Sequence, residues 1–317
     1  MASGDNPDQP RHPRSLQGLL KFAMEATKDE DAPREHSMEQ MDEERRQFLE
    51  LALNTVTVDV ATEFEKAVQI FEDRDAADEA KVDALEACLE YVQDLDAAND
   101  FFQIGGFQII RPGLESSNAN IRSCMLRLIG AMTQHNPFCQ LKMLEMDILP
   151  KLMEMLSDEP KVAENALHAM SCLIRHCDQA IVAFMAIGGV ECILRCMEVG
   201  SEKLKACAAF LTTGMVTSYP ASRDEFIKLD AVEIFMGIIK PTTKDYDPEL
   251  DTALYALKHL IECDEAKQRC SSEEGFKEKL DTIIEHSRGN SACEEILRCS
   301  QFILKRCFSD HNDETGR

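Results

Sequence analysis

The sequence predicts an all-α protein built as a solenoid of stacked helical repeats, and three observations support this. Junctions followed by an apolar residue recur 41, 42, 42 and 44 residues apart, at Gly106, Asp147, Gly189, Ala231 and Gly275. Between junctions, apolar residues recur every three or four positions, which is helical spacing. With 14 glycines, 11 prolines and no tryptophan in 317 residues, the composition favours helices over sheet. A period in the low forties is typical of armadillo or HEAT repeats, and we predict a right-handed armadillo solenoid.

The same period divides the chain. A polar, acidic start is expected to be disordered. Helical patterns on either side of the repeats would act as caps, because terminal repeats must cover the open ends of a continuous core. The predicted parts are an arm at 1–41 with an apolar docking motif at 15–24, an N-terminal cap at 42–98, four repeats at 99–263, a C-terminal cap at 264–309 and a disordered tail at 310–317.

The charge balance limits the partners. Lys and Arg number 34 against 58 Asp and Glu, which gives a net charge of −24. So acidic a chain repels phosphate groups, and we therefore expect neither nucleic acid nor membrane as a partner. We expect a monomer.

The thirteen cysteines point to a reducing compartment. No apolar run follows the polar start at Met1–Arg14, so no signal peptide is expected. Cys88, Cys124 and Cys207 occupy core-like helix positions, where a free thiol packs as a small hydrophobe. The expected location is the cytoplasm, with the nucleus as a second compartment.

We find no catalytic pattern and expect neither an enzyme nor a cofactor. The glycine pairs at 105–106 and 188–189 share one repeat phase, so they indicate turns rather than phosphate loops. Cys172 and His176 lie four residues apart, as do Cys192 and Cys196. A zinc site needs about four ligands, usually with a close cysteine pair that is absent here, so we expect no metal. His168 could act as a general base, but no nucleophile that it would activate can be identified.

The remaining candidates for function are exposed residues that could bind a partner. In stacked three-helix repeats the longest helix of each repeat lines the concave face. The apolar phase of these helices leaves polar and basic residues available for a partner, although any one of them also fits an ordinary solvated surface. The candidates are Arg122, Asn165, His168, Arg175, Lys203, Lys205, Phe210 and Thr213.

An apolar island stands alone in the polar arm. Leu16, Leu19, Leu20, Ala23 and Met24 recur at helical spacing after a candidate N-cap serine. So short a helix is marginal by itself in water. The island therefore indicates a docking segment, either for the protein's own core or for a partner.

Several stretches together resemble the armadillo-type nucleotide exchange factors of heat-shock protein 70 chaperones. The resemblance begins in the arm with Leu16-Gln-Gly-Leu-Leu-Lys-Phe-Ala-Met24 and Glu43-Glu-Arg-Arg-Gln-Phe-Leu49. It continues in the repeats and at the end of the last helix, with Ser171-Cys-Leu-Ile-Arg175, Lys203-Leu-Lys-Ala-Cys-Ala-Ala-Phe-Leu211 and Cys307-Phe308-Ser309.

This resemblance implies a non-enzymatic co-chaperone. It would embrace the chaperone's ATPase domain with its concave face and promote ADP release. The arm motif would help to release bound substrate by acting as a pseudo-substrate, through Leu16, Leu19, Leu20, Lys21 and Phe22.

The alternative is an armadillo scaffold that binds extended peptides of other partners. Adaptors of that kind line their groove with repeated Trp and Asn, and the absence of Trp weighs against this reading.

Overall fold

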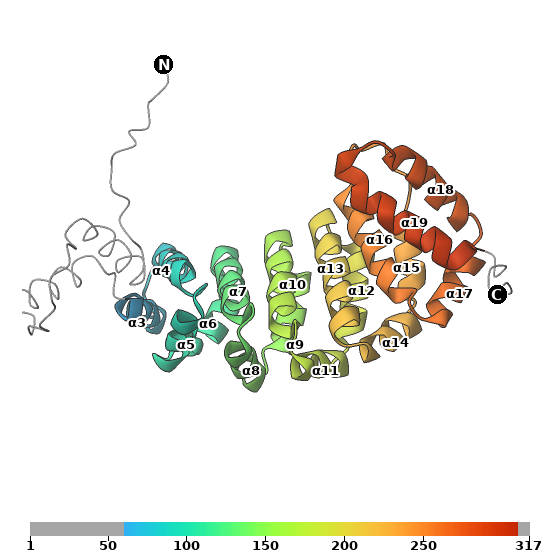
Figure 1. The fold of residues 1–317 in the computed structure, drawn as a ribbon. Helices are drawn as coiled ribbons and strands as arrows, with labels where there is room; N and C mark the ends of the chain where they lie inside the picture. The colour runs from blue at the N-terminus through green and yellow to red at the C-terminus, as the bar shows by residue number, and fades with distance from the viewer. Residues whose placement is uncertain (1–59, 310–317) are drawn as a thin grey trace, which may run out of the picture. The chain divides into compact units, whose positions relative to one another are not determined.

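The computed structural model describes residues 60–309, and every regular element in that range is helical (Figure 1). The predicted all-α armadillo architecture is confirmed. After α3 (Val60–Glu72) and α4 (Asp78–Tyr91), the helices follow one another in triplets of two short helices and one long helix. The first triplet consists of α5 (Leu95–Gln103), η1 (Gly106–Ile109) continued by α6 (Ile110–Leu114), and α7 (Ala119–Thr133).

The next three triplets have the same order. The second is α8 (Pro137–Glu145), α9 (Leu149–Glu154) with η2 (Met155–Ser157), and α10 (Pro160–Ile174). The third is α11 (Asp178–Ala186), α12 (Gly189–Val199) and α13 (Glu202–Ser218), and the fourth is α14 (Ala221–Lys228), α15 (Ala231–Ile238) and α16 (Pro248–Leu260). The segment expected as a C-terminal cap repeats this order in α17 (Asp264–Ser272), α18 (Phe276–Ser287) and, after η3 (Ser291–Cys293), α19 (Glu294–Phe308).

The long helices form one layer. Consecutive long helices contact each other along the series α4, α7, α10, α13, α16 and α19. The short helices lie at one edge of this row and behind it (Figure 1). We call the row the long-helix layer. It positions the candidate site, because equivalent residues of successive repeats stand side by side along it.

A residue in the left-handed conformation turns the chain between the first and second helix of every triplet. Only Gly, Asn and Asp adopt this conformation at low cost, which explains why the predicted junctions are so regular in sequence. The residues are Gly105, Asp147, Gly188, Asp230 and Gly275, with φ of 91°, 51°, 81°, 59° and 77°. Each lies within one residue of a predicted junction.

The glycine after the turn has a packing role in two triplets. A Cβ atom on Gly106 would lie 2.5 Å from the ring of Phe101, and one on Gly189 would lie 2.5 Å from the ring of Phe184. Both phenylalanines are fully buried. The second helix can therefore approach the first only where the side chain is absent.

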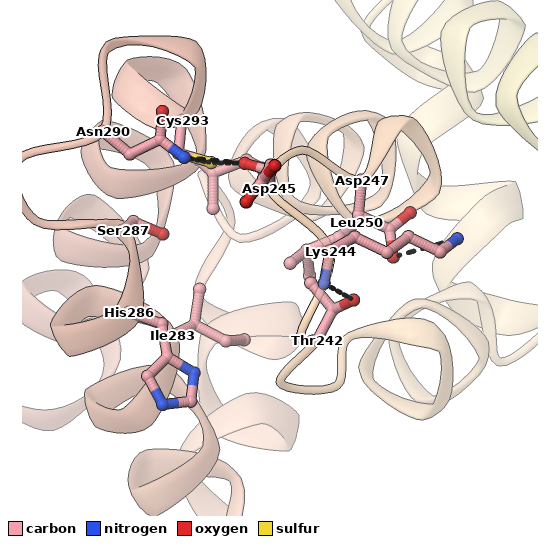
Figure 2. A pocket seen from close by; sticks show the side chains of 11 residues that line it. Thr242, Lys244, Asp245, Asp247, Leu250, Ile283, His286, Ser287, Asn290 and Cys293 are labelled. Carbon is pink, nitrogen blue, oxygen red and sulfur yellow. Dashed lines mark hydrogen bonds and ion pairs between the residues drawn. The ribbon is translucent and has the colours of Figure 1, made fainter.

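The loop before α16 is fixed to the last triplet. Asn290 Nδ2 donates to the carbonyl oxygen of Asp245 at 2.7 Å, and Cys293 Sγ donates to the same oxygen at 3.1 Å. Figure 2 shows the pocket beside this contact, whose volume is about 30 Å³. A pocket of this size has room for water but not for an organic ligand.

Helix lengths bear on membrane insertion. Between residues 60 and 309 no single helix is long and apolar enough to cross a bilayer. Two consecutive helices pass such a test together, α11 and α12, and they are bent by 76° at the break between them.

Candidate partner-binding face

The solvent-facing side of the long-helix layer is a narrow row of residues. Because α7, α10, α13 and α16 each pack between two other long helices, one residue near the middle of each is exposed while both of its chain neighbours are buried. These residues are Arg127, His168, Phe210 and Tyr255, and the exposed Phe302 continues the row on α19. We call these five residues the stripe. It is basic or polar on α7 and α10 and aromatic from α13 onwards.

An open groove accompanies the first part of the stripe. It lies over α4, α7 and α10 and has a volume of about 600 Å³. Arg127 on its wall pairs with Glu86, and this hydrogen bond lowers the pKa of the Glu86 carboxyl. The other lining residues are Leu89, Gln93, Leu95, Ala131, Gln134, His135 and His168.

Two of the predicted site residues meet at the centre of the stripe. The Arg175 guanidinium lies 4.4 Å from the centre of the Phe210 ring, and its Nη2 donates to Ser171 Oγ at 3.1 Å. Gln140 fixes the end of α10 by donating to the carbonyl of Arg175 at 2.9 Å. Half of Phe210 remains exposed, at 50%. An exposed ring beside a cation suits a protein partner, since aromatic residues and Arg dominate binding energies at interfaces.

His168 is exposed on the same face, where its surroundings favour the neutral imidazole. Partial desolvation lowers the pKa of its imidazole, and the neighbouring Arg175 lowers it further. Its Nε2 lies 3.7 Å from Cys172 Sγ. Among the described residues, no group of three or more His, Cys, Asp or Glu side chains could hold a metal ion.

The predicted lysines and asparagine occupy different environments. Lys203 is 85% exposed, with Glu164 at 3.9 Å, so it is available to a partner. Lys205 Nζ instead pairs with Glu249 at 3.2 Å and ties α13 to the start of α16. Asn165 Nδ2 donates to Ser123 Oγ at 2.7 Å and ties α10 to α7.

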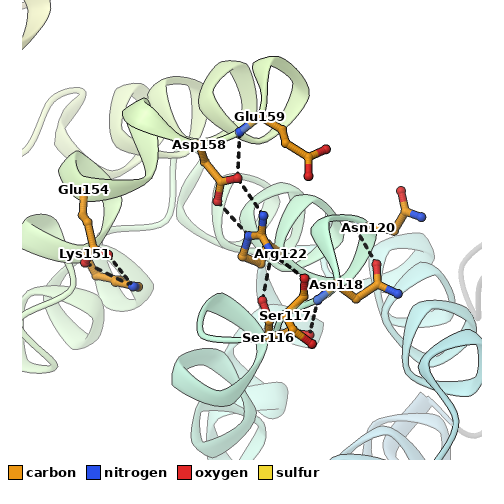
Figure 3. A network of polar contacts seen from close by, with 9 residues as sticks. All are labelled: Ser116, Ser117, Asn118, Asn120, Arg122, Lys151, Glu154, Asp158 and Glu159. Carbon is orange, nitrogen blue, oxygen red and sulfur yellow. Dashed lines mark hydrogen bonds and ion pairs between the residues drawn. The ribbon is translucent and has the colours of Figure 1, made fainter.

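Arg122 does not have the exposure that was expected of it. Its Nε and Nη2 donate to the two carboxylate oxygens of Asp158 at 2.7 and 2.6 Å, and its Nη1 donates to the carbonyls of Ser116 and Ser117 at 2.9 and 3.1 Å (Figure 3). Its side chain is only 14% exposed. Each of the three guanidinium nitrogens therefore donates inside the protein, where Arg122 joins the first triplet to the second.

Thr213 was expected on the surface and is buried, with 7% of its area exposed. Its hydroxyl donates to the Ala209 carbonyl at 3.1 Å, one turn back along α13. The neighbouring long helices cover this side of α13, which leaves Phe210 as the exposed position. The apolar pattern of a single helix does not show that a second long helix also packs against it.

Sequence reasoning missed the last part of the stripe. Lys258 Nζ lies 5.1 Å from the ring centre of Tyr255 and 5.8 Å from that of Phe302. For Phe302 the signal was the fifth junction at Gly275, which indicates one more triplet and therefore one more long helix on this face. Tyr255 and Lys258 lie on the long helix of the fourth predicted repeat, from which no site residue was assigned. The arm motif of Leu16, Leu19, Leu20, Lys21 and Phe22 lies outside the described residues.

Fold and face together define a class of protein, an armadillo-type binding protein whose exposed face consists of side chains suited to another protein. Two family models match consecutive parts of the chain. The model for the nucleotide exchange factor Fes1 matches residues 16–101, and that for the SIL1/FES1/HPBP1 C-terminal domain matches residues 97–217. The chain belongs to this family of nucleotide exchange factors.

Individual relatives agree with the family models. Hsp70-binding protein 1 of Macaca fascicularis is 28% identical over 324 residues, which cover 96% of this chain and 87% of that protein. The Hsp70 nucleotide exchange factor FES1 of Eremothecium gossypii is 30% identical over 41% of this chain and 47% of its own length. Among solved structures, a designed armadillo repeat protein superposes with a TM-score of 0.64 at 15% identity, over 77% of this chain and 99% of that one.

Proposed function

We propose that this protein is a co-chaperone that binds the ATPase domain of a heat-shock protein 70 and accelerates the release of ADP. One observation supports this above the others: the likeness to Hsp70-binding protein 1 runs through 96% of this chain, arm and repeats together. The protein itself makes and breaks no bond in this role, and it needs no metal or cofactor.

The mechanism is differential binding. A ligand shifts a conformational equilibrium only by as much as its affinities for the two states differ. The long-helix layer would bind the open, nucleotide-free form of the ATPase domain more tightly than the closed, ADP-bound form. By linkage, ADP must then weaken the binding of this protein by the same factor.

The binding residues that we propose are the exposed His168, Lys203 and Phe210 of the long-helix layer. Arg175 joins them, because its guanidinium lies against the exposed Phe210 ring. Arg122, Asn165, Lys205 and Thr213 are engaged within or between repeats, so we assign them a structural role.

Stopped-flow fluorescence tests the proposal. A labelled ADP is loaded on a heat-shock protein 70 ATPase domain and chased with unlabelled nucleotide, with and without this protein. We expect release to accelerate at least tenfold at saturating protein. Unchanged release at saturation would exclude the exchange function.

For the arm we propose the separate task of clearing substrate from the chaperone. A short apolar run with one basic residue suits a chaperone's peptide groove. Replacing Leu19, Leu20 and Phe22 by alanine should slow the release of a bound peptide while sparing ADP release. Equal loss of both activities would refute this division of labour.

We further propose a monomer of the reducing cytoplasm that binds neither nucleic acid nor membrane. The net charge of −24 supports the last point. The thiols support the compartment, because burial raises the pKa of Cys88, Cys139 and Cys299 to about 12 and so keeps them protonated. All thirteen cysteines are free.

A further inference from the structure

We propose that Tyr255, Lys258 and Phe302 form a second anchor, which binds the same ATPase domain as Arg175 and Phe210. This inference rests on the proposed function and adds to it a contact on the fourth and fifth triplets. We call the Arg175–Phe210 pair the central anchor and the Tyr255–Lys258–Phe302 cluster the distal anchor.

The distal anchor repeats the chemistry of the central one. Tyr255 and Phe302 are 38% and 41% exposed, although large hydrophobic side chains are mostly buried elsewhere in the long helices. Lys258 Nζ lies within 6 Å of both ring centres, as a cation–π contact requires. The result is an apolar surface with a cation at its middle, contributed by two helices.

Two carboxylates beside the distal anchor are paired with cations. Glu295 is 4.0 Å from Lys258 and 3.1 Å from Arg298, and Glu262 pairs with Arg223 at 2.6 Å. These two carboxylates are therefore compensated in place, whereas Asp251 on α16 accepts, among the described residues, only from the Tyr246 hydroxyl. In a protein of charge −24, an acidic group of a partner can approach the Lys258 cation with less repulsion than it meets elsewhere on the chain.

The occupant follows from continuity with the central anchor. Tyr255 holds the same position on α16 that Phe210 holds on α13, an exposed residue between buried chain neighbours. The two helices pack together directly, and the Lys205–Glu249 ion pair joins them at 3.2 Å. Lys244, in the loop before α16, also pairs with Glu202 of α13 at 3.5 Å. A partner that contacts Phe210 can therefore also contact Tyr255, the next residue of the stripe.

Two anchors on one packed row explain how binding can favour one conformation of the partner. A single contact binds the open and closed forms of a domain alike if the contacted surface does not change. Two contacts held at a fixed separation fit only the form in which the partner's two surfaces have that separation. The distal anchor would therefore contribute to selectivity as well as to affinity.

The test is the double variant Tyr255→Ala/Phe302→Ala. Its affinity for the nucleotide-free ATPase domain is measured by calorimetry, and ADP release by stopped-flow fluorescence. We expect at least tenfold weaker binding, since aromatic anchors are typical hot spots. Affinity within twofold of the wild type would overturn the proposal.

The matched control is Phe138→Ala/Val182→Ala, which removes two apolar side chains of comparable exposure, 38% and 50%, from the short helices α8 and α11. It should bind like the wild type. Thermal unfolding reports whether either variant is folded. Should the alanine variant unfold, Lys258→Glu decides, because it reverses the half-buried cation beside the two rings and should likewise weaken binding at least tenfold.

The outcomes separate this inference from the proposed function. If the wild type does not accelerate ADP release, the exchange function fails and the distal anchor fails with it. If the wild type is active and the double variant binds equally well, only the distal anchor fails. Self-association of the wild type that the double variant abolishes, with chaperone binding intact, would assign this surface to a second copy and overturn the proposal.

Discussion

Arg122 and Arg175 lie on the same layer of helices, and their immediate partners give them different roles. Arg122 meets a carboxylate and two carbonyl groups at the junction of two triplets, whereas Arg175 rests on an exposed ring. The sequence places both at the ends of predicted long helices. It does not reveal that the Asp158 carboxylate, from the next repeat, pairs with Arg122.

Breaking the Arg122 contact should destabilise the fold. In Arg122→Met, Asp158 keeps its charge at a largely covered position, and the Ser116 and Ser117 carbonyls lose their donor. Some solvent remains near the pair, so we expect a loss of about 1–3 kcal/mol in the free energy of unfolding. Urea unfolding measures this loss, and an unchanged midpoint would contradict the structural role.

The same pair should give the stability a defined pH dependence. Hydrogen bonds from Arg122 lower the pKa of the Asp158 carboxyl in the folded state. Its contribution is therefore complete above the unfolded value of about 4 and is lost as the pH falls through the lowered folded value. The stability difference between wild type and Asp158→Asn should be constant from about pH 8 to 5 and shrink below about pH 4. A difference that grows in acid would be inconsistent with this sign.

Arg175 and Phe210 should matter for binding and little for folding. Phe210→Ala removes an exposed ring and the surface on which Arg175 rests. We expect at least tenfold weaker binding to the ATPase domain, with a thermal midpoint within a few degrees of the wild type. Lys203→Glu should have a smaller effect because an exposed charge at the rim acts mainly on the association rate. Equal affinity of wild type and Phe210→Ala would remove the central anchor from the account.

At the scale of the helices, the regularity comes from the turns. A left-handed Gly or Asp ends the first helix of every triplet, and in two triplets the following glycine admits a phenylalanine ring. These features recur at a fixed period, which is why sequence alone places the junctions to within one residue. The sequence could not predict which residues link neighbouring triplets. The Asn165–Ser123 hydrogen bond and the Lys205–Glu249 ion pair do not recur in the other repeats.

Two glycine substitutions should have opposite effects. Gly189→Ala places a Cβ against the buried Phe184 ring, so we expect a loss of about 1–3 kcal/mol in stability from overpacking. Gly214 lies inside α13 with nothing within 4 Å of the position of a Cβ. Gly214→Ala should therefore be neutral or stabilise the protein by up to about 1 kcal/mol. Thermal unfolding of the two variants compares them, and similar shifts would contradict the packing explanation.

At the scale of the whole chain, periodicity predicts the architecture but not how far the stripe of exposed residues extends along the long-helix layer. The armadillo stack and its junctions are visible in the spacing of apolar residues. Phe302 was missed because residues 264–309 were interpreted as a cap rather than as a fifth triplet. Tyr255 lies on α16 in the fourth predicted repeat, from which no site residue was assigned. Thr213 was assigned to the face because a helical wheel does not show that long helices cover α13 on both sides.

The central claim is that this protein binds the open form of a heat-shock protein 70 ATPase domain better than the closed form. The most direct measurement is its affinity for that domain by calorimetry, without nucleotide and with saturating ADP. The account predicts weaker binding in ADP, by the same factor by which this protein weakens ADP binding. Equal affinity in both conditions would contradict it.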